Sequence, residues 1–94
     1  MQSIKVFGKN YKINRVDGFE DPLELGNTDY EGTINIKNFK DKDFERETIL
    51  HETIHCIDDA LGLDLTEKQV TAISSALYCI YKENQINITG ISGE

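Results

Sequence analysis

Both histidines of the chain lie in one pentapeptide, where His51 and His55 stand four residues apart and Glu52 follows the first of them. Residues four apart share one face of a helix, so this spacing lets both imidazoles meet a single metal ion if the segment is helical. Glu52 can then reach a water on that ion as a general base. The pentapeptide therefore predicts a helix with His51 and His55 as zinc ligands and Glu52 as the catalytic residue.

An ordinary amphipathic helix that happens to carry two histidines is the alternative. Two observations favour the metal site. The chain has no other histidine, and the apolar pair Ile49 and Leu50 leads into the pentapeptide, as expected for a motif on a buried helix.

Length and charge limit the function classes. A chain of 94 residues predicts one domain, 1–94, with a modest core and a site that is either an open groove or completed by a partner. The net charge of −7 argues against nucleic acid and anionic membranes as partners, because both require basic patches. The acidity serves solubility, and it weakly favours a basic peptide partner.

Two cysteines, Cys56 and Cys79, lie in apolar helical patterns and form no C-x-x-C motif. They predict buried free thiols in a reducing compartment, and a bridge between packed helices stays open as the alternative. No secretory signal and no run of transmembrane length occurs in the sequence, which predicts a cytoplasmic protein.

Residues 1–40 have the pattern of strands and loops. Short alternating segments predict strands at 4–7, 11–16 and 33–36, with a tight turn at 8–10, a loop at 17–27 and a turn at 28–32. The fold class expected is α+β, with a small antiparallel or mixed sheet of about three strands packed on two helices.

Two helices follow, and each has terminal signals. The active-site helix occupies 41–62, with Asp41 or Asp43 as N-cap and Gly62 as its stop. Thr66 and Gln69 form a capping box that opens the second helix, 66–84. Its apolar positions at helical spacing are Val70, Ile73, Leu77, Ile80 and Tyr81. Residues 85–94 are a polar tail with isolated isoleucines.

Catalytic zinc takes three protein ligands and a water, so a third ligand is required. Glu67, in the first turn of the second helix after the Gly62 break, is our choice, because the short link folds that helix back across the first. Asp58 and Asp59 are the rivals. Their more natural role is to accept the far N–H of a ligand histidine and so orient its ring.

The segments Leu50–Asp58, Leu61–Leu63 and Leu65–Val70 resemble small phage- and prophage-encoded zinc metallopeptidase-like proteins near the ImmA/IrrE and SprT-like families. The wider resemblance is to gluzincins and the short minigluzincins, whose glutamate ligand commonly stands in E-x-x-A-[DN]. This chain has Glu67-Lys68-Gln69-Val70-Thr71, so Thr71 departs from the acid or amide that helps to hold a histidine there.

The resemblance implies a sheet whose edge strand lines the cleft, and Thr33–Ile36 is the candidate onto which a substrate peptide could add as a strand. It implies an activated water with Glu52 passing the proton to the leaving amine. Tyr78, Tyr81 and Tyr30 are candidates for an oxyanion donor, with core packing the stronger interpretation of Tyr78 and Tyr81.

The function predicted is a zinc-dependent metalloendopeptidase with one zinc per chain and a peptide or protein substrate, such as a regulator by analogy with ImmA-type proteins. The alternative is a non-catalytic zinc-binding module that retains a peptidase fold. A latent enzyme, in which residues 85–94 cover the metal, is intermediate. Manganese, iron or cobalt stay open as the ion, because two imidazoles and a carboxylate suit several metals.

Overall fold

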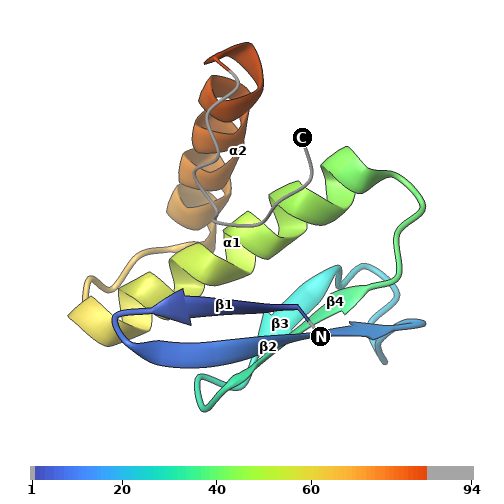
Figure 1. Ribbon diagram of the computed structural model, residues 1–94, viewed down its shortest axis with the longest axis horizontal. Helices are drawn as coiled ribbons and strands as arrows, with labels where there is room; N and C mark the ends of the chain where they lie inside the picture. Colours follow the sequence, from blue (N-terminus) through green and yellow to red (C-terminus); the bar gives the residue numbers. More distant parts are fainter. Residues whose placement is uncertain (1, 85–94) are drawn as a thin grey trace.

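The computed structural model describes residues 2–84 and has the predicted α+β architecture. Its elements in chain order are the strands β1 (Ser3–Val6), β2 (Lys9–Val16), β3 (Gly26–Thr28) and β4 (Thr33–Lys37) and the helices α1 (Lys42–Leu61) and α2 (Glu67–Asn84). The strands form one mixed sheet, α1 lies across one face of it, and α2 crosses α1 on the side away from the sheet (Figure 1). The predicted tail, 85–94, lies outside the described residues.

The first two strands form the hairpin that the sequence predicts. Phe7 and Gly8 make its two-residue turn, both with positive φ (49° and 85°), which matches the twist of the flanking strands. Side chains then alternate along both strands, and the inward ones are buried beneath α1: Ile4, Val6, Tyr11 and Ile13.

The sheet order is β1-β2-β4-β3, with β4 parallel to β2 and antiparallel to β3. The expectation that Thr33–Ile36 forms the edge strand is therefore wrong, because β4 has a neighbour on each side and the edge strands are β1 and β3. The sequence predicts a loop and a turn at 26–28, which have no apolar alternation to mark a strand. A row of amides on the outer face ties this strand to the sheet: Asn14 donates to Asn35 at 2.9 Å, and Asn35 donates to Asn27 at 3.0 Å.

Helix α1 begins and ends where its caps predict. Asp41 is the N-cap, and its carboxylate accepts from the backbone N–H of Asp43 at 2.9 Å. Gly62 takes the left-handed conformation at φ 63° and donates to the carbonyl of Asp58. Between the caps, Ile49 and Cys56 are buried against the sheet, where they pack with the fully buried Ile34 and Ile36.

Helix α2 opens with the predicted capping box: Thr66 N–H donates to the Gln69 side chain at 2.8 Å, and Gln69 N–H donates to Thr66 Oγ1 at 3.1 Å. Its buried stripe differs from the expected one. Ile73 and Ile80 are exposed, and the buried residues are Val70, Ser74, Tyr78 and Tyr81. Since α2 packs on α1 alone among the described elements, only one narrow stripe is covered.

Both cysteines are free, as predicted, and no bridge joins them. Cys56 is buried, but Cys79 is exposed on α2, so its predicted burial is wrong. Neither α1 nor α2, the helices of the part that the structure describes, combines the length and apolarity needed to cross a membrane.

A partly buried ion pair fixes the start of α1 to the sheet. Arg15 on β2 binds both oxygens of Glu45 in the first turn of α1, at 2.7 Å through Nη2 and 3.3 Å through Nε. Glu45 is only 5% exposed, and the Arg15 hydrogen bond holds the pKa of its carboxyl below the ordinary value. The pair fixes the first turn of α1 on the sheet. The candidate site lies further along the same helix.

We expect Arg15→Met to lower the free energy of unfolding by about 2 kcal/mol at pH 7, because Glu45 is left buried without its bidentate partner, with Lys42 at 3.8 Å and Arg46 as the remaining nearby cations. The folded-state pKa of Glu45 lies below its unfolded value. Its contribution is therefore complete above about pH 4.5 and is lost as the pH falls through the folded value. Denaturant titrations from pH 7 to pH 3 should show the two proteins converging in acid. Lys12→Met, an exposed change on the same strand, is the control, and an equal loss there would contradict the assignment.

Candidate metal centre

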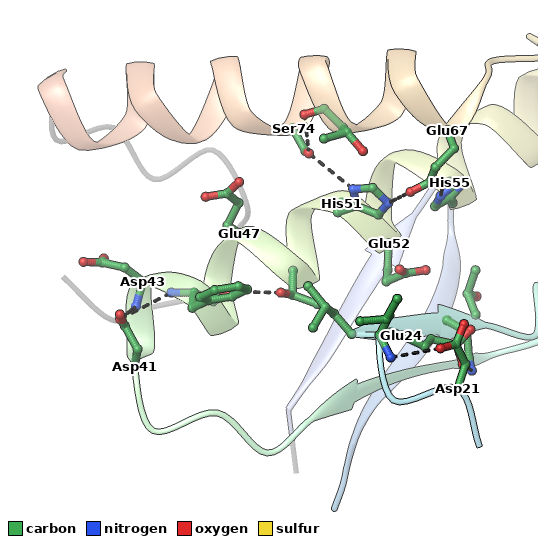
Figure 2. A pocket seen from close by; sticks show the side chains of 18 of the residues that line it. Asp21, Glu24, Asp41, Asp43, Glu47, His51, Glu52, His55, Glu67 and Ser74 are labelled. Carbon is green, nitrogen blue, oxygen red and sulfur yellow. Dashed lines mark hydrogen bonds and ion pairs between the residues drawn. The ribbon is translucent and has the colours of Figure 1, made fainter. Parts of the chain in front are cut away.

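Three side chains from α1 and α2 converge at one point. His51 Nε2 lies 2.8 Å from one oxygen of Glu67, and His55 Nε2 lies 2.9 Å from the other. The two imidazole rings meet edge to face, with centroids 5.0 Å apart. Figure 2 shows the Glu67 carboxylate beside the two rings. The structure thus brings together the three predicted ligands.

The link between the helices explains how Glu67 reaches the histidines. The carbonyl of Asp58 accepts from the N–H groups of Gly62 and Leu63, which turns the chain at the end of α1. The Asp58 carboxylate then accepts from the N–H of Leu65 at 3.2 Å, which holds the link just before α2 begins. Asp58, predicted as a rival ligand or as an orienting residue, therefore holds the link that sets the start of α2.

The donor set fits zinc. One ligand atom from each of His51, His55 and Glu67 lies within 4.8 Å of the others. Tetrahedral zinc with bonds of about 2.1 Å separates its ligand atoms by about 3.3 Å, so the carboxylate needs to move only slightly to admit the ion. Side-chain exposures of 19% and 20% for the two histidines leave room for a fourth ligand from the cleft.

Glu52 lies beside this centre, and its environment is unusual for a carboxylate. It is only 5% exposed, and within residues 2–84 no group donates a hydrogen bond to it. Burial, followed by the nearby charges of Glu67 and Glu24, raises the pKa of Glu52 to about 7. A carboxyl with a pKa near neutral pH can accept and release a proton efficiently, which is the property required of a general base.

Gly26 on the edge strand makes space for Glu52. A Cβ at this position would lie 3.3 Å from Cγ and Oε2 of Glu52 and 3.0 Å from the carbonyl oxygen of Asn35. Glycine in a strand often marks the close approach of another group, and here that group is the Glu52 side chain. The backbone of β3 therefore forms the wall against which the proposed base lies.

Ser74 is a site residue that the sequence reasoning missed. It is 1% exposed, donates its hydroxyl to the carbonyl of Thr71 at 3.1 Å, and lies 3.5 Å from Nδ1 of His51 (Figure 2). A hydroxyl that donates to a carbonyl can accept from an imidazole N–H. That arrangement keeps the proton on Nδ1 and the lone pair of Nε2 toward the metal. The signal in the sequence is the spacing of Ser74 four residues after the buried Val70.

The remaining candidates are distributed around the site. Thr71 lines the cleft and contributes through its carbonyl to Ser74, while Asp59 is exposed near the end of α1. Tyr78 and Tyr81 pack in the core between the helices, and the Tyr78 hydroxyl donates to Asp43 at 2.6 Å. Of the three tyrosines proposed as oxyanion donors, only Tyr30 borders the cleft.

The cleft has a volume of about 840 Å³ and runs along α1 between α2 and the β3 edge. Leu25 and Asp29 bond to β4 through their backbones, so by alternation the N–H and C=O groups of Gly26 and Thr28 point away from the sheet. These free backbone groups border the cleft that contains His51 and His55. An extended peptide laid there would meet a strand edge on one side and the histidine pair on the other.

Comparisons of the chain with protein-family models, with curated proteins and with solved structures found no match.

Substitution of Glu67 tests the third ligand. Glu67→Ala should weaken zinc binding by two orders of magnitude or more, because the two imidazoles alone leave half of the tetrahedral shell to water. Zinc affinity by competition with a chromophoric chelator measures this. Glu83→Ala removes the same charge from the far end of α2 and should leave the affinity unchanged. Unaltered affinity in Glu67→Ala would eliminate Glu67 as a ligand.

Substitution of Ser74 tests the orienting role. Ser74→Ala should lower zinc affinity by about tenfold, the low end of the range for such outer partners because the contact is long. The ¹⁵N chemical shifts of His51 in metal-free protein should also show the tautomer mixture shifting away from the Nδ1–H form. Ser75→Ala is the control, since that hydroxyl donates to Glu47 at 3.0 Å. An unchanged His51 tautomer would remove Ser74 from the site.

Proposed function

We propose that this protein is a zinc-dependent metallopeptidase that hydrolyses peptide bonds with Glu52 as general base. The observation that carries the proposal is the convergence of the two imidazole Nε2 atoms and the Glu67 carboxylate in one open cleft. Beside them lies Glu52, a buried carboxyl whose pKa is raised to about 7. Each residue type suits its role: three ligands leave a fourth position for substrate or water, and the base stands next to it.

Zinc would supply Lewis acidity for the scissile carbonyl and would lower the pKa of a bound water to about 7. His51, His55 and Glu67 hold the ion, and Ser74 fixes the ring of His51. A Glu52 carboxylate oxygen accepts the proton of the attacking water and delivers it to the leaving amine nitrogen.

The substrate would bind as an added strand along β3. The outward N–H and C=O groups of Gly26 and Thr28 offer backbone hydrogen bonds to an extended peptide, which is the mode known as β-augmentation. Strand β3 thus takes the substrate-binding role that the sequence suggested for Thr33–Ile36, because that segment lies inside the sheet. Binding through the backbone also aligns the peptide with α1, so that a carbonyl faces the histidine pair.

A non-catalytic zinc module, the alternative, is less well supported by Glu52. A structural ion needs ligands only, and it gains nothing from an additional buried carboxyl. Burying the Glu52 carboxyl without a hydrogen-bond donor lowers the stability of the fold. Such a cost is expected for a residue that is kept for catalysis. Free Cys56 and Cys79 support the proposal that the enzyme works in the cytoplasm, where thiols stay reduced.

Substitution of Glu52 tests the chemistry. Glu52→Gln is nearly isosteric, and it should keep one zinc per chain while lowering kcat by about three orders of magnitude or more, because the amide cannot take up a proton. Elemental analysis gives the metal content, and mass spectrometry of an unstructured protein digest gives the activity. Glu31→Gln, an exposed change outside the cleft, is the control. Undiminished cleavage by Glu52→Gln would refute the proposed base.

A further inference from the structure

The walls of the cleft carry one sign of charge. Within residues 2–84, seven acidic residues line the cleft, and none of the lysines and arginines does. The seven are Asp21, Glu24, Asp41, Asp43, Glu47, Glu52 and Glu67. The net charge of −7 alone does not explain this distribution, because the basic residues of the described part all lie outside the cleft.

Several of these carboxylates already have structural partners. Asp41 caps α1, Asp43 accepts from Lys82 at 3.0 Å and from Tyr78, and Glu47 accepts from Ser75. Glu67 bridges the two histidines. These four therefore hold the helices in place, and only Asp43 has its charge compensated by a lysine.

Asp21 and Glu24 are different. Both lie in the loop before β3, across the cleft from α2, with Glu24 toward Glu52 (Figure 2). Their bonds are to neutral groups: Asp21 accepts from the N–H of Leu23 at 2.9 Å, and Glu24 accepts from the Asn27 side chain at 3.4 Å. Both charges are therefore held in place without a cation to compensate them.

A buried group in the same wall also indicates a ligand. Glu52, one of the seven, is 95% buried, lacks a hydrogen-bond donor within residues 2–84, and faces the cleft beside Glu24. A cation brought between these groups would relieve repulsion that the free protein carries.

We propose that the cleft selects peptides with a lysine or arginine beside the scissile bond, and that Asp21 and Glu24 receive the cationic head. Leu23 stands between them and is 85% exposed, so it offers an apolar surface for the methylene stem of that side chain. The proposal rests on the metallopeptidase function for the position of the scissile bond, whereas the charge selection itself is a binding property of the cleft.

Binding of matched peptides to the zinc-loaded Glu52→Gln protein tests the selection without turnover. Two fluorescent peptides differ only in one central residue, lysine or glutamate, and fluorescence anisotropy gives the affinity of each. The lysine peptide should bind about tenfold more tightly at low salt, and the ratio should fall toward one at about 0.5 M salt, where the charges are screened.

A charge-matched pair of variants locates the effect. Asp21→Asn/Glu24→Gln in the Glu52→Gln background should reduce the lysine preference to about twofold or less. Glu20→Gln/Glu31→Gln changes the net charge equally at exposed sites outside the cleft and should keep it. Equal loss in both double variants would show that net charge, not the cleft wall, attracts the peptide, and would overturn the proposal.

Cleavage by the wild-type zinc-loaded protein separates this inference from the proposed function. Cleavage of an unstructured protein without enrichment of basic residues at the cut sites, together with equal binding of the two peptides, overturns the inference and leaves the peptidase function standing. Lysine-selective binding without any cleavage supports the charge selection and overturns the peptidase function. Neither binding nor cleavage overturns both.

Discussion

The contact between the first turn of α2 and the middle of α1 organises this molecule. Glu67 spans His51 and His55, and it reaches them because the link from Gly62 to Thr66 is short and Asp58 holds it at both its backbone and its side chain. The same link makes α2 cross α1, which buries Val70 and Tyr78. The packing of the second core and the assembly of the candidate metal centre are thus consequences of one turn.

Glu52 shows how function and stability oppose each other in a small domain. Its folded-state pKa of about 7 lies above its ordinary value, so deprotonation on going from pH 5 to pH 8 destabilises the metal-free fold. Gly26 increases the burial by letting the strand backbone approach, and Glu24 adds repulsion. A divalent cation bound by His51, His55 and Glu67 would offset these costs and so couple folding to metal binding.

The sequence predicts those features of the site that depend on helical spacing and capping. His51, Glu52 and His55 follow from one pentapeptide, and Glu67 follows from the position of the capping box after Gly62. Ser74 and β3 do not, for physical reasons. The apolar residues of α2 lie on two faces of the helix. Only the way α2 crosses α1 decides that Ser74 is buried and Ile73 is exposed. Three residues with a glycine become a strand only because β4 and the Asn35 amide pair with them.

The placement of charge follows from the same geometry. Because α1 is the floor of the cleft and, among the described elements, the only one that α2 covers, the cleft walls are the start of α2 and the loop before β3. The loop residues Asp21 and Leu23 are exposed, so burial does not dictate their side chains and their composition is free to serve binding. Glu24 lies there close enough to Glu52 for their charges to repel, and neither Asp21 nor Glu24 has a cation among its bonding partners. Charges that no ion pair compensates, in the wall of the candidate metal centre, are best understood through what binds there.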